Sequence, residues 1–112
     1  MGVERSDWIV VGVDIGMKHY DDENYEYFDQ YAERNRLGDI TFLIDGMSGQ
    51  YFIVGEVLLH ADAYNGFGLS EFPLIETDEL KESSERVLNF VKMNFEMEKH
   101  PEPKLIVLTH WT

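Results

Sequence analysis

A run of acidic residues in the first third of the chain is the main candidate for a functional surface. Residues 21–33 contain six carboxylates and no basic residue. Four of them, at spacings of four, three and four residues, would lie along one side of an α-helix: Asp22, Glu26, Asp29 and Glu33. Like charges at such spacings destabilise an isolated helix by about 0.2–0.5 kcal/mol per pair. We therefore expect the negative charge of this segment to have a function.

Tyrosines alternate with these acids and add the apolar contact area that protein interfaces favour. We therefore predict that this segment binds a basic protein surface. The predicted binding residues are Asp21, Asp22, Glu23, Tyr25, Glu26, Asp29, Tyr31 and Glu33. The alternative interpretation is an exposed helix whose tyrosines pack inward and whose acids only keep the chain soluble.

Two aspartates at the ends of predicted strands offer a different chemistry, the binding of a divalent metal. Asp14 lies in the segment VGVDIG, residues 11–16, which resembles the opening strand of RNase H-like nucleases and actin-like ATPases. That resemblance implies a metal-holding role for Asp14, and with Asp45 it defines an alternative function, a metal-dependent hydrolase or nuclease. The expected topology places the two residues about 10 Å apart, and Asp before Gly also favours a turn.

The remaining residue types exclude several kinds of site. The chain has no cysteine, so it has no thiol nucleophile, disulfide or thiolate zinc site. His60 and Asp62 would share one face of a strand, but two ligands are too few for a closed metal site. No phosphate-binding loop has the required spacing. We expect no catalytic residues, no cofactor and no resident metal, and hence a protein that is not an enzyme.

The charge distribution narrows the class of partner. The net charge is −13; residues 19–80 carry fourteen acids and two bases, whereas residues 81–112 carry five of each. This field repels nucleic acid and anionic membranes and attracts basic proteins. Residues 37–80 contain no Lys or Arg, which argues against direct nucleic-acid binding. No apolar run suits a membrane span or a signal segment, so we expect a cytoplasmic protein.

The elements that must position these residues follow one another as strand, helix, strand, strand, helix, strand. The predicted strands cover residues 8–13, 39–45, 50–60 and 105–108. One predicted helix covers residues 23–37, and the second begins at its cap Thr77 and is ended by Pro101 and Pro103. Leu80, Ser84, Val87, Val91 and Phe95 mark the apolar side of the second helix. Residues 46–49 have the chemistry of a hairpin turn, Gly55 indicates a bulge or a close backbone approach, and residues 64–73 indicate an irregular loop.

This order predicts a single acidic α+β domain over residues 1–112. Two right-handed crossovers and one hairpin give the βαββαβ arrangement, the ferredoxin-like split βαβ fold. In that fold an antiparallel sheet carries both helices on one face, and its strands lie in the order fourth, first, third, second.

In size, charge and tyrosine content, the chain resembles the small acidic inhibitors that phages make against host defence nucleases, including nucleic-acid mimics and anti-CRISPR proteins. The resemblance rests on no motif and assigns no residue. It implies a non-enzymatic inhibitor that binds a basic surface of a nuclease or another nucleic-acid-handling protein. A third interpretation is a structural or assembly protein that self-associates through Trp8, Trp111 and an edge strand.

Overall fold

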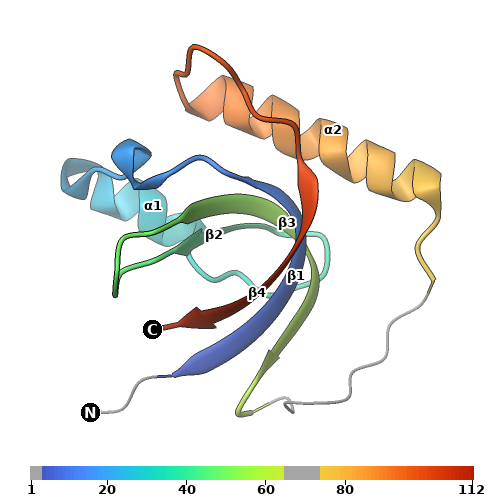
Figure 1. Ribbon diagram of the computed structural model, residues 1–112, viewed down its shortest axis with the longest axis horizontal. Helices are drawn as coiled ribbons and strands as arrows, with labels where there is room; N and C mark the ends of the chain where they lie inside the picture. Colours follow the sequence, from blue (N-terminus) through green and yellow to red (C-terminus); the bar gives the residue numbers. More distant parts are fainter. Residues whose placement is uncertain (1–3, 65–73) are drawn as a thin grey trace.

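The computed structural model describes residues 4–64 and 74–112, and its elements follow the predicted order (Figure 1). The strands are β1 (Arg5–Asp14), β2 (Ile40–Ile44), β3 (Phe52–Asp62) and β4 (Lys104–Trp111). The helices are α1 (Tyr25–Tyr31) and α2 (Thr77–Asn94), and the 3-10 helices η1 (Met17–His19) and η2 (Asp22–Asn24) precede α1. The irregular loop predicted over residues 64–73 lies, apart from Tyr64, outside the described residues.

The strands form one sheet in the order β2-β3-β1-β4, and all neighbouring strands are antiparallel. Read from the other edge, this is the predicted order of fourth, first, third, second. The predicted α+β class and strand order are therefore confirmed. The two central strands are β1 and β3.

Both helices pack on one face of the sheet, as predicted. Phe28 of α1 and Val87 and Val91 of α2 share a core cluster with Phe42 of β2 and Phe52 of β3. Val87, Val91 and Phe95 of the predicted apolar side are buried. Leu80 and Ser84 are only half-buried, and Ser83, which was not predicted, is buried beside them.

The first helix is much shorter than the predicted span of residues 23–37. It ends at Tyr31; Ala32 is extended and bridges to Phe42, and Glu33 has a φ of 54°. The backbone N–H of Glu33 donates to the carbonyl oxygen of Phe42, at 3.1 Å. Pairing with strand β2 therefore replaces the helical hydrogen bonds here, without any Gly or Pro to stop the helix.

The opposite face of the sheet carries a second cluster made by the strands themselves. It contains Trp8, Val10, Leu43, Ile53 and Val57, and Trp8 is only 1% exposed. Figure 1 shows that the strands bend strongly along their length. We infer that the sheet wraps around this cluster and buries it without a covering helix.

The two central strands approach each other closely where Gly12 pairs with Gly55. A Cβ atom on Gly12 would lie 2.5 Å from the carbonyl oxygen of Val54, and one on Gly55 would lie 2.9 Å from Cγ2 of Val10. The close approach predicted for Gly55 is confirmed. The bulge lies nearby, because the register shifts between Ile9 and Val10.

Gly12→Ala is expected to lower the free energy of unfolding by about 1–3 kcal/mol, because the strands must separate to admit the methyl group. Gly46→Ala is the matched control, since a Cβ there meets nothing within 4 Å. Urea denaturation of both variants measures the difference. Equal stability of the two variants would show that the close approach is not needed.

Candidate functional site

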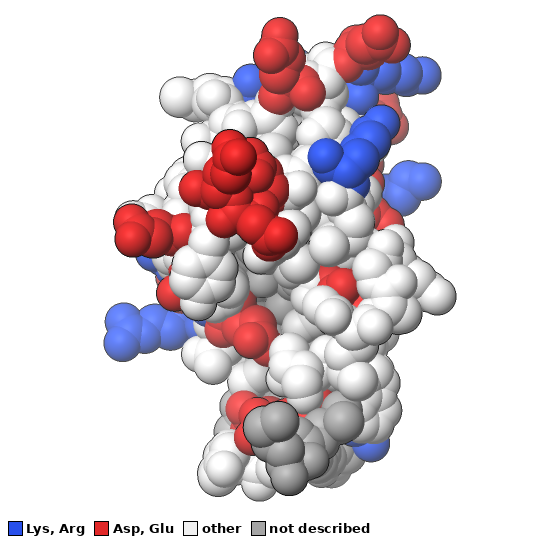
Figure 2. All heavy atoms as spheres, turned by 90° about the vertical axis from the view of Figure 1, so that its left-hand side faces the viewer, with Lys and Arg blue, Asp and Glu red and all other residues white. Residues whose placement is uncertain are grey.

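Five exposed carboxylates gather over η2 and α1, and we call them the acidic face: Asp21, Asp22, Glu23, Glu26 and Asp29. Figure 2 looks onto this side of the molecule and shows acidic side chains grouped there. Among the residues that the structure describes, no Lys or Arg forms an ion pair with any member of the face. Its negative charge is therefore directed to solvent.

Local hydrogen bonds and the core hold the acidic face in place. The side chain of Asp21 accepts from the backbone N–H of Glu23 at 2.9 Å and from the Asn24 amide at 3.0 Å, which fixes the start of η2. Phe28 anchors the other side of α1 in the core. Acids in the first turn also suit the positive end of the helix, which offsets part of their mutual repulsion.

The tyrosines of this segment mostly face inward. The Tyr31 ring packs against Phe42 and Phe90, with centroids 4.8 Å and 5.3 Å away. The Tyr27 hydroxyl donates to the side-chain oxygen of Asn94 at 3.0 Å. Of the two tyrosines predicted to bind a partner, Tyr25 is 59% exposed, whereas Tyr31 belongs largely to the core. For Tyr31, the inward-packing interpretation holds.

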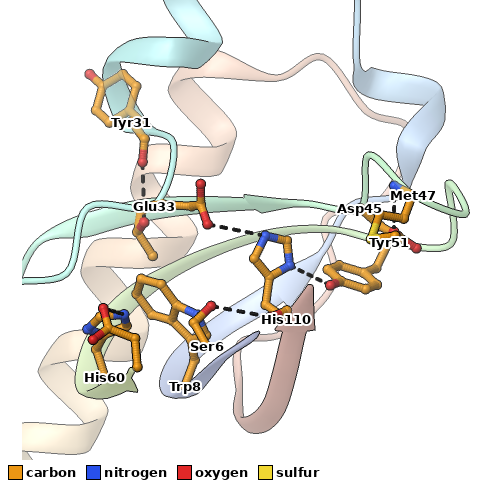
Figure 3. A network of polar contacts seen from close by, with 11 residues as sticks. Ser6, Trp8, Tyr31, Glu33, Asp45, Met47, Tyr51, His60 and His110 are labelled. Carbon is orange, nitrogen blue, oxygen red and sulfur yellow. Dashed lines mark hydrogen bonds and ion pairs between the residues drawn. The ribbon is translucent and has the colours of Figure 1, made fainter. Parts of the chain in front are cut away.

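Glu33 leaves the predicted acidic row because the helix ends before it. Its Oε1 atom lies 3.6 Å from Nε2 of the buried His110 on β4. The other imidazole nitrogen, Nδ1, lies 2.5 Å from the hydroxyl of Tyr51 (Figure 3). These contacts thus link three segments: Glu33 follows α1, His110 lies near the end of β4, and Tyr51 lies between β2 and β3, just before Phe52.

The electrostatics of this network favour neutral groups. Burial lowers the pKa of His110, so its imidazole is neutral at pH 7 and its Nδ1 accepts from Tyr51. Burial and the charges of Asp45 and Glu33 raise the pKa of Tyr51 to about 12, so the hydroxyl keeps its proton and donates. A protonated tyrosine is a poor nucleophile. The contacts of Glu33, His110 and Tyr51 therefore have a structural role: they hold distant segments together.

Trp8 and His60 lie beside this network. The Trp8 indole N–H donates to Oγ of Ser6 at 2.9 Å, and that hydroxyl donates to the carbonyl oxygen of His110 at 3.3 Å. Trp8 is buried and satisfied, so its predicted place in a self-association surface is wrong. The His60 ring packs on Trp8, and its Nε2 lies 3.5 Å from Oδ2 of Asp62, so the predicted common face of His60 and Asp62 is confirmed.

The two aspartates of the alternative metal site both shape turns. Asp45 is buried and accepts from three backbone N–H groups and a hydroxyl, those of Met47, Ser48 and Gln50 and the side chain of Ser48. Asp14 accepts from the N–H groups of Gly16 and Phe52. Within residues 4–64 and 74–112, no cluster of three or more His, Cys, Asp or Glu could hold a metal ion.

No sequence pattern indicates the His110 network, because its members lie far apart in the chain. The contacts of His110 join β4 to Tyr51, 59 residues away in the chain, and to Glu33. Across the described ranges, no helix has both the length and the apolar character to cross a membrane. No family model, curated protein or solved structure matches the chain.

Asp45→Asn is expected to lower the free energy of unfolding by about 2 kcal/mol at pH 7. The backbone N–H groups of the turn hold the pKa of Asp45 at about 2, below its usual 3.8. The stabilisation is therefore complete above the unfolded pKa and is lost as the pH falls through about 2. Urea denaturation from pH 7 to pH 2 measures it.

The exposed Asp29→Asn serves as the control for this series. A difference between the wild type and Asp45→Asn that stays constant down to pH 2 would contradict the assigned role of the ionised carboxylate.

Proposed function

We propose that this protein is a non-enzymatic interaction protein whose acidic face binds a basic surface of another protein. The observation that carries the proposal is the set of exposed carboxylates on one anchored segment, with no ion pair to Lys or Arg in the described parts of the chain. Glu26 and Asp29 are exposed on α1, Asp22 is exposed on the preceding η2, and Tyr25 adds exposed aromatic area.

Anchoring strengthens this proposal. A helix of seven residues does not persist alone in water, so α1 owes its shape to the packing of Phe28 and its aromatic neighbours. The carboxylates are therefore carried on a segment that is already ordered. Binding through an ordered segment avoids the entropy lost when a flexible chain is fixed.

The chemistry of the partner follows from charge complementarity. A row of carboxylates fits a groove lined by Lys and Arg, and such grooves bind the phosphates of nucleic acids. We therefore propose a nuclease or another nucleic-acid-handling protein as the partner, with inhibition as the result. The support is the net charge of −12 in residues 19–80 together with the surface position of the acidic face.

Charge reversal of three members of the acidic face, with Asp22, Glu26 and Asp29 changed to Lys, is expected to lower partner affinity at low salt at least tenfold, mainly through the association rate. Affinity capture at low and high salt with mass spectrometry identifies the stoichiometric basic partner. Biosensor kinetics with that purified partner then compare the variants.

The matched control carries the same change of charge outside the acidic face, with Glu76, Glu85 and Glu102 changed to Lys; all three are exposed. The control should keep most of the affinity. If both triple variants bind equally well, the acidic face is not the binding surface.

Self-association through β4 is a second candidate function. This strand lies at the edge of the sheet, and its residues 105–109 carry no charge. Leu105, Val107 and Trp111 are exposed on it, Val107 by 73%. Edge strands usually carry charges or prolines that block pairing with other chains. Of the two tryptophans first considered, only Trp111 stays available for this contact.

Val107→Lys tests the edge, because a charge in the middle of β4 opposes pairing with a second strand. If β4 mediates assembly, the wild-type mass rises with concentration in sedimentation equilibrium and the variant stays monomeric. Met93→Lys is the control, since Met93 is an exposed apolar residue on α2. A wild type that is monomeric at every concentration excludes this candidate.

A further inference from the structure

A pocket of about 270 Å³ lies between the N-terminal half of α2 and β3. Just before β2, Gly38 donates to the carbonyl oxygen of Val57 and Asp39 accepts from its N–H, each at 2.9 Å, and Leu37 and Gly38 border the pocket. The pocket has an apolar wall made by Leu37, Val57, Leu58, Ile75 and Leu80. This volume is at the lower end for ligand sites, so it suits a small molecule.

Buried polar groups lie along the same pocket. Glu56 is buried and accepts two hydrogen bonds from the Arg86 guanidinium, at 2.8 Å and 2.7 Å, so the two charges neutralise each other. Ser83 is 3% exposed, and its hydroxyl has no hydrogen-bond partner. An unsatisfied buried hydroxyl is costly, so a ligand group that bonds to it gains free energy on binding.

The charge of the pocket selects the polar group of the ligand. Glu79 and Glu82 are exposed residues of α2 that line it, and Arg86 is already paired with Glu56. The lining therefore carries three carboxylates and one guanidinium. This excess of negative charge repels an anionic ligand and attracts an ammonium group.

We propose that this pocket binds a small primary amine with an apolar body. The apolar body lies against the Leu, Ile and Val side chains, the ammonium group donates to the Ser83 hydroxyl, and the carboxylates of Glu79 and Glu82 stabilise its charge. The site is separate from the acidic face and does not depend on the proposed protein partner.

Three probes of similar shape test the proposal: 2-phenylethylamine, 2-phenylethanol and phenylacetate. Amide chemical shifts in ¹⁵N-labelled protein, followed during titration, give both the location and the affinity. The amine is expected to shift residues of the pocket and to bind at least tenfold more tightly than the acid, with the alcohol between them.

Two sets of variants separate the contribution of the Ser83 hydroxyl to amine binding from that of the Glu79 and Glu82 carboxylates. Ser83→Ala should weaken amine binding about fivefold, the value of one hydrogen bond. Glu79→Gln with Glu82→Gln should weaken the amine several-fold and leave the alcohol unchanged, and this pair keeps the test valid if Ser83→Ala does not fold. Glu26→Gln with Asp29→Asn, on the acidic face, is the matched control. Equal binding of the three probes, shifts outside the pocket or no shifts at millimolar concentrations would overturn the proposal.

Discussion

The close approach of Gly12 and Gly55 at the centre of the sheet is the constraint on which the rest of the structure depends. A Cβ atom at either position would collide with the neighbouring strand. Glycine here lets the central strands lie close and the sheet bend, as glycines in strands commonly do. Bending brings His110 of β4 to Tyr51 and Glu33, although β4 and β2 are opposite edges of the sheet. That contact encloses Trp8 and its cluster without a helix.

Because one face of the sheet buries its own apolar residues, both helices are free to cover the other face. The α1 segment needs only a short apolar side, and Phe28 with the inward tyrosines supplies it. Its outer side then carries acids at little risk to the fold, since core contacts rather than helix propensity hold the segment. The bent sheet and the exposed acidic face thus have one cause: the apolar residues are divided between two clusters, one on each face of the sheet.

Local patterns predicted the parts of this structure that local interactions decide. Apolar β-branched runs marked the strands, Gly55 marked the close approach, and the order of elements led to the correct sheet. Long-range pairing decided the rest. The end of α1 depends on the hydrogen bond between Glu33 and Phe42, which no pattern in residues 23–37 indicates. His110 meets partners from distant segments, and the pocket beside Ser83 is formed by residues of α2, β3 and the segment before β2.

Two groups of acids in the chain differ in their partners, and the difference bears on function. Buried acids have dedicated partners: Asp45 accepts from the N–H groups of its turn, and Glu56 binds Arg86. The acids over η2 and α1 are exposed and have no basic partner among the described residues. Acids that served only solubility could be spread over the surface with less repulsion. Concentrated on one ordered segment, they repel one another before any partner arrives, and a basic surface would relieve that repulsion when it binds. The relief adds to the direct attraction, and both contributions should weaken as salt is raised.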